Sequence, residues 1–203
     1  MIKQISALLA ATCFLLGGCA PASSAPKNMY IRPAELTQEE NDLAELLGAD
    51  QRLFDFELDD SVQSMQIACY RLEDGEWKPE VGGWRQFTDP NGRLALGFED
   101  LREGLRTAVQ SEHSSGGERY DRPAADDEQA GIATMTLASE TSLEYEQEIP
   151  LVLQTQSTAD EHISFSTDYF FRPEELEQQG YEAVFAVTVC FSEKTVSEQS
   201  DVN

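Results

Sequence analysis

The chain has 203 residues, with 38 acidic and 14 basic side chains and a formal net charge of -24 at pH 7. Such a charge argues against nucleic acid as a partner, because phosphate binding requires clustered lysine and arginine. It also argues against a domain that lies flat on anionic lipid, since protein contacts with such lipid are polybasic. The length allows one domain with a substantial hydrophobic core.

The first residues have the order of a bacterial export signal. Lys3 supplies a positive charge, and an apolar stretch runs from Ile5 to Gly18 and ends at Cys19. This stretch is too short for a membrane-spanning helix, which needs about 20 apolar residues. Residues 16–19, with the sequence Leu-Gly-Gly-Cys, resemble the lipobox of bacterial lipoproteins.

The lipobox resemblance implies two processing steps. A diacylglycerol is attached to the thiol of Cys19, and the chain is then cleaved between Gly18 and Cys19. Cleavage removes Lys3 and no acidic residue, so the formal charge changes from -24 to -25. The protein is then expected on the extracytoplasmic face of the cell membrane, held by the Cys19 lipid. The alternative is an ordinary secretory signal that contains a cysteine by chance.

Three segments follow from this interpretation. Residues 1–18 are the signal peptide, and residues 19–28 are a lipid-anchored flexible tether. The tether contains proline, alanine and serine but almost no large apolar side chain, so it cannot bury enough surface to offset the entropy of ordering. Residues 29–203 form a single acidic, β-rich domain.

One short helix is predicted at the start of this domain. Thr37 and Glu40 are spaced as in a capping box, in which the two side chains satisfy free N–H groups at a helix N-terminus. Leucines follow at helical spacing, and Gly48 suits a left-handed stop. The helix is expected from about residue 38 to 47.

After the helix, apolar residues alternate with polar ones, which is typical of half-buried strands. Asp74-Gly75 and the segment Asp89-Pro90-Asn91-Gly92 are predicted turns between strands. The strand candidates are residues 54–58, 62–72, a return strand from Trp77, 94–98, 105–109, 132–137, 149–153, 163–165 and 181–191.

Successive strands without intervening helices predict a mainly β fold. We expect an antiparallel β-sandwich of the immunoglobulin-like kind, with the short helix at its N-terminal end. The alternative is an α+β domain in which residues 99–107 are helical, although Gly104 opposes that helix.

The segment 111–131 is polar and is expected to be a long exposed loop. Asp121 and the run Asp126-Asp127-Glu128 make it the best candidate for calcium, which takes several oxygen ligands. The spacing fits no known ligand pattern, so a solvated charge run is favoured and no metal site is predicted.

Cys69 and Cys190 are the only cysteines of the β-rich domain. Exported thiols often form disulfides. Here the alternation places Cys190 opposite the large apolar set of its strand, while Cys69 groups with Met65 and Ile67. Two buried free thiols are therefore favoured over a disulfide.

No catalytic residue or cofactor is predicted. His113 and His162 are present, but the sequence contains no motif that places either histidine beside a nucleophile or a metal. Glycoside hydrolysis uses a pair of carboxylates, but this sequence has so many acidic residues that the presence of such a pair does not indicate that activity.

The tether, the short helix and the acidic β domain together resemble uncharacterised surface lipoproteins of Gram-positive bacteria. The expected function is a non-enzymatic binding or protein-interaction module, whose partner is a protein or an extracellular ligand. The alternative is an envelope-associated hydrolase acting on wall or host polymers, which requires a cleft with converging polar groups.

Overall fold

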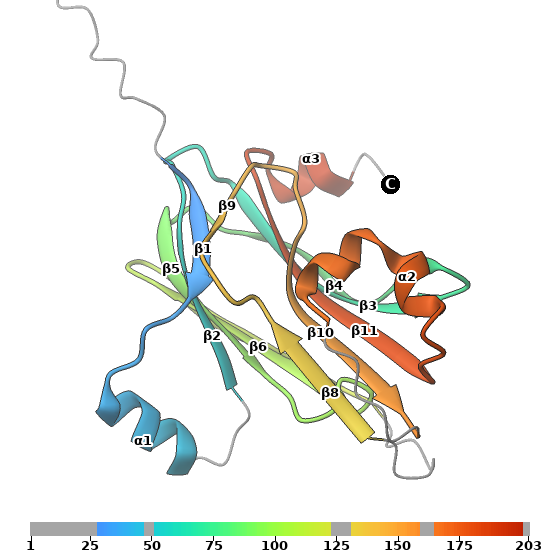
Figure 1. The fold of residues 1–203 in the computed structure, drawn as a ribbon. Coiled ribbons are helices and arrows are strands. Elements are labelled where there is room, and N and C mark those ends of the chain that lie inside the picture. Colours follow the sequence, from blue (N-terminus) through green and yellow to red (C-terminus); the bar gives the residue numbers. More distant parts are fainter. Residues whose placement is uncertain (1–27, 47–50, 123–130, 159–164, 201–203) are drawn as a thin grey trace, which may run out of the picture.

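The computed structural model describes residues 28–46, 51–122, 131–158 and 165–200. Two antiparallel sheets lie face to face in this part of the chain (Figure 1). The predicted signal peptide, the lipidation site Cys19 and nearly all of the predicted tether lie outside the described residues. No helix among the described residues combines the length and the apolar character needed to cross a membrane.

The first sheet, sheet A, has the strand order β7-β6-β5-β2-β1-β9. All its neighbouring strands run antiparallel. The strands are β1 (Tyr30–Pro33), β2 (Gln51–Glu57), β5 (Asn91–Gly97), β6 (Gly104–Ser111), β7 (Ser115–Asp121) and β9 (Thr141–Ser142).

The second sheet, sheet B, has the strand order β4-β3-β11-β10-β8 and is also antiparallel. Its strands are β3 (Ser64–Glu73), β4 (Glu76–Gln86), β8 (Gly131–Thr136), β10 (Ile149–Ser157) and β11 (Ala183–Ser192). The helical segments of the described residues are α1 (Gln38–Leu46), η1 (Thr167–Phe171), α2 (Pro173–Glu177) and α3 (Val196–Ser200).

The main core lies between the two sheets. Leu94 and Leu96 of β5 are fully buried there, and the Phe56 ring of sheet A lies 5.1 Å from the Phe191 ring of sheet B, measured between centroids. Each such side chain stabilises the fold by about 1.5–3 kcal/mol when it leaves water. Because side chains alternate along a strand, this burial also fixes which residues point outward.

Part of the outer face of sheet B is buried as well. A second apolar cluster forms where η1 and α2 cover that face (Figure 1). Trp77 of β4 stacks on Phe170 of η1 with centroids 5.2 Å apart, and its indole Nε1 donates to the Phe170 carbonyl at 2.8 Å. This double burial explains why nearly every residue of β11 is buried.

The predicted mainly β sandwich is confirmed. In the described residues the two sheets hold six and five strands, and this total of eleven exceeds the seven to nine strands of the immunoglobulin fold. The predicted Asp74-Gly75 hairpin turn is also confirmed, since β3 and β4 flank it and both residues have positive φ, 51° and 74°.

The segment from Asp89 to Gly92 was predicted as another turn of this kind, and that prediction is wrong. It connects β4 of sheet B to β5 of sheet A, so it crosses between the sheets. Gly92 lies within β5, where a Cβ atom would come within 2.6 Å of the Phe56 ring. This glycine is therefore suited to close packing rather than to a left-handed turn.

Two further expectations are corrected between residues 99 and 121. Residues 99–107 are not helical, because β6 begins at Gly104, whose φ of 149° brings a hypothetical Cβ within 2.2 Å of the Tyr120 carbonyl oxygen. The segment 111–131 is not a single long loop, because β7 pairs with β6 along its whole length.

The two cysteines lie on opposite faces of sheet B as free thiols. Cys69 belongs to the core between the sheets. Cys190 points to the outer face of sheet B, on the same side of β11 as Val184 and Ala186. Burial raises the pKa of each thiol to about 12. Neither thiol is positioned to react as a thiolate.

We predict that neither thiol reacts with Ellman's reagent in the native protein beginning at residue 28. Both should react after unfolding in guanidinium chloride, because the reactive thiolate forms only once the thiol reaches solvent. Pretreatment with a reductant should not change the count, and Cys190→Ala should lower it from two to one. A disulfide would show itself as no thiol before reduction and two after it.

Candidate functional site

The outer face of sheet A, which points away from the core, carries small side chains and charged side chains of both signs. In β5 the inward positions are buried leucines, and the outward positions include Ala95 and Gly97. In β6 the inward positions are again buried, and the outward positions include Arg106 and Ala108. The strand register brings these four residues next to one another.

These residues line a hollow of about 600 Å³, which we call the sheet A hollow. Ligand sites for small molecules typically have volumes of about 300 to 1,000 Å³. The short side chains of Ala95, Gly97 and Ala108 leave its floor open. The charged residues that line it are Arg106, Arg119, Glu99, Asp100, Glu103 and Asp121.

Two arginines face each other across neighbouring strands in this hollow. Arg106 of β6 is the direct cross-strand partner of Arg119 of β7. Arg119 forms an ion pair with Asp121 through its Nε atom. Among the described residues Arg106 has no ion-pair partner, and its side chain is exposed. Like charges directly opposite each other destabilise a sheet.

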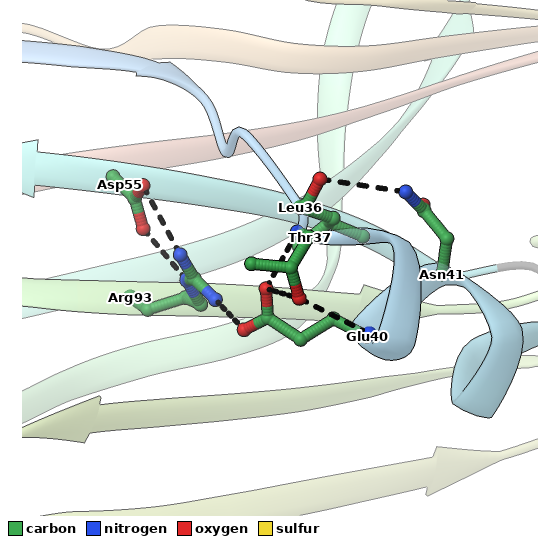
Figure 2. Close-up of polar contacts among 6 residues, drawn as sticks. All are labelled: Leu36, Thr37, Glu40, Asn41, Asp55 and Arg93. Atoms are coloured by element: carbon green, nitrogen blue, oxygen red, sulfur yellow. Dashed lines mark hydrogen bonds and ion pairs between the residues drawn. The ribbon is translucent and has the colours of Figure 1, made fainter.

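The first turn of α1 is fixed to the same face of sheet A. Figure 2 shows the predicted capping box, in which the Thr37 backbone N–H donates to the Glu40 carboxylate at 2.8 Å and the Glu40 N–H donates to Thr37 Oγ1 at 3.3 Å. Arg93 donates to Glu40 at 3.2 Å and, through Nε, to Asp55 at 2.7 Å. Arg93 shares the outward face of β5 with Ala95, so α1 begins beside the hollow.

The loop between β5 and β6 forms a fixed rim. Its Asp100 is buried and accepts a hydrogen bond from Gln156 of β10 at 2.7 Å. The fully buried Gln154 accepts from the Leu101 N–H at 2.7 Å and donates to the Glu99 carbonyl at 3.0 Å. Satisfied buried polar networks of this kind give a unique geometry, so the rim is preorganised.

His113 does not form a catalytic triad in the described residues. Its Nδ1 atom lies 3.0 Å from Asp89, and the hydroxyls of Ser111 and Ser114 donate to the same carboxylate rather than to the imidazole. The hydrogen bond from Ser111 is the main factor that lowers the pKa of Asp89. In a triad the histidine lies between the acid and the nucleophile. His162 lies outside the described residues.

A second unusual arginine lies between the sheets. Arg85 of β4 pairs across strands with the core residue Met65, so its side chain points inward. Its Nη2 atom is buried without a hydrogen-bond partner, and it forms no ion pair within the described part of the chain. Burial lowers the pKa of its guanidinium.

The acidic segment considered for calcium is only partly described. Asp121 belongs to β7, where Arg119 pairs with it, and Asp126, Asp127 and Glu128 lie outside the described residues. Across residues 28–46, 51–122, 131–158 and 165–200, no group of three histidine, cysteine, aspartate or glutamate side chains is arranged to hold a metal ion.

Comparisons with models of protein families, with curated proteins and with solved structures found no match. The geometry of the described residues and the sequence pattern are therefore the basis for inferring function. The sheet A hollow was not predicted from the sequence. The alternation of residues 105–109 turns Arg106 outward, but the opposing Arg119 belongs to a strand that was expected to be a loop.

We predict that Thr37→Ala destabilises α1 by about 1 kcal/mol, because the first turn loses its capping hydrogen bonds. Hydrogen exchange measured by NMR should become about fivefold faster for the α1 amides and stay unchanged for β11. A matched control exists in Thr195→Ala, which removes the equivalent cap of Glu198 at α3 and should affect α3 alone.

Acid should weaken the same cap. Hydrogen bonds from Thr37, first from its backbone and then from its hydroxyl, hold the pKa of Glu40 below its ordinary value of 4.5. A lowered folded-state pKa stabilises the folded state above the ordinary value and loses that effect as the pH falls through the lowered pKa. Protection of α1 should therefore be constant above pH 4.5 and fall below it. Equal protection in wild type and Thr37→Ala at pH 7 would contradict the role of the cap.

Proposed function

We propose that this chain is an exported, lipid-anchored binding module that presents the sheet A hollow to an envelope protein or an extracellular ligand. The observation that carries the binding part is the hollow itself, which combines an open floor, a fixed rim and an arginine without an ion-pair partner in the described residues. Concave surfaces with a few converging polar groups are the usual form of ligand sites.

The lipobox resemblance of residues 16–19 supports the anchoring part of the proposal. A lipid on Cys19 would hold the protein at the membrane, and the net charge of -25 of the cleaved chain would repel the folded domain from anionic headgroups. A tether between lipid and domain would then leave the outer face of sheet A accessible to partners.

The alternative hydrolase would need a nucleophile or a water-activating pair at the hollow. Its rim instead uses Asp100 to accept hydrogen bonds from the fold, and the hydroxyls nearest His113 donate to Asp89. These contacts favour the binding module. Hydrolysis of esters, peptides or glycosides by the purified protein, lost on substitution of a residue lining the hollow, would favour the hydrolase.

We predict that Cys19 carries the anchor. When the full chain is expressed in a bacterium, mass spectrometry should find an N-terminal peptide that begins at Cys19 and carries a diacylglyceryl group, and the protein should fractionate with membranes. Cys19→Ser should abolish both results, and Cys13→Ser should change neither. Secretion of an unmodified protein cleaved elsewhere would show an ordinary secretory signal.

We also predict that the hollow is where the partner binds. A photoreactive amino acid placed at Ala108, an exposed position of the hollow, should give a crosslinked adduct on cells that produce the protein. The same group at the exposed Glu174 of α2 serves as the control and should give none. The Ala108 adduct should weaken when Arg106→Gln is added. Adducts from Glu174 alone would place binding on sheet B instead.

A further inference from the structure

Almost every basic side chain in the described residues has an acidic partner, as an excess of carboxylates would favour. Arg106 and Arg85 form no ion pair with the described residues, and of these two only Arg106 lies in the sheet A hollow. The paired ones are Arg32, Arg71, Lys78, Arg93, Arg102, Arg119, Arg122, Arg172 and Lys194.

The position of Arg106 has a cost within the fold. It lies directly across from Arg119, and side chains of equal charge in that position repel each other. Glu99 and Glu103 line the same hollow, but neither forms an ion pair with Arg106 in the described part of the chain. The charge of Arg106 is therefore available to a bound ligand.

The geometry of Arg119 allows it to take part. Its ion pair with Asp121 uses Nε, which leaves the Nη groups as donors. Guanidinium groups bind carboxylates through two parallel hydrogen bonds, and such charged hydrogen bonds are among the strongest in proteins. An anion between the two arginines would also relieve their mutual repulsion.

We propose that the sheet A hollow binds the free C-terminal carboxylate of a short peptide between Arg106 and Arg119. This inference rests on the proposed function, in which the hollow is the binding site. The floor formed by Ala95, Gly97 and Ala108 leaves space for the last residues of the peptide, and the hollow is much larger than a lone carboxylate requires.

The surrounding charge selects a carboxylate over a phosphate. The protein carries a net charge of -24, and Glu99, Glu103 and Asp121 line the hollow beside the arginines. This negative field opposes a dianion more strongly than a group with a single charge. The same acidic side chains would attract the ammonium group of a short peptide, which makes a zwitterionic ligand more favourable than a polyanion.

The test is a calorimetric titration of the full chain, purified in detergent, with three probes. The probes are trialanine, trialanine with an amidated C-terminus, and inorganic phosphate. The variants are Arg106→Gln and, as a matched control with the same loss of charge, Arg172→Gln. Arg172 is the N-cap residue of α2, at the other side of the sandwich. Arg106 is exposed, so its replacement should not prevent folding, and circular dichroism checks this.

Trialanine is expected to bind, and its amide and phosphate are expected to bind at least tenfold more weakly. Arg106→Gln should weaken trialanine binding by about 10- to 100-fold, the range expected for the loss of a charged hydrogen bond, while Arg172→Gln should leave it unchanged. Equal binding of trialanine and its amide would overturn the carboxylate assignment, and so would preference for phosphate. Absence of any binding, or binding unaffected by Arg106→Gln, would also overturn it.

These outcomes are separable from failure of the proposed function. If a partner crosslinks at Ala108 but trialanine and its amide bind equally, the hollow remains a binding site and the carboxylate ligand is rejected. If no adduct forms at Ala108 and peptide binding is unaffected by Arg106→Gln, the hollow is rejected as the binding site.

Discussion

Burial of apolar side chains between the two sheets is the constraint on which the rest of the structure depends. The inward positions of β2, β5 and β6 are almost all apolar and buried against sheet B. Once these positions are fixed, alternation leaves no freedom for the outward ones. A shift of one residue in β5 would bury Arg93 and expose Leu94, so the core sets the position of α1 and of the hollow.

The sequence predicted the strands whose alternation is strong and missed those that carry few large apolar side chains. β11 and β5 were found because large apolar residues recur at every second position. β7 was assigned to a loop because it contains Gly116 and Gly117 and only one large apolar side chain. β7 forms because it pairs with β6, and the pattern within one segment of sequence does not reveal its partner strand.

The candidate site was predictable only in part for the same reason. The outward position of Arg106 follows from alternation, and the capping box of Thr37 and Glu40 could be recognised from spacing alone. The rim could not be foreseen, because Gln154 and Gln156 reach the loop between β5 and β6 across more than fifty residues of sequence. Buried glutamines interrupt the apolar pattern of a strand, and only their hydrogen-bond partners explain why they are buried.

The inward arginine of β4 has a consequence for how molecules meet side by side. Within the described residues β4 is an edge strand of sheet B, and an exposed edge invites a strand of another copy to pair with it. A strand added beside β4 would close over Arg85 and bury its unpartnered guanidinium further, while Pro79 offers no N–H for the new pairing. Copies crowded on one membrane by the proposed lipid anchor would thus be hindered from pairing with each other through the β4 edge.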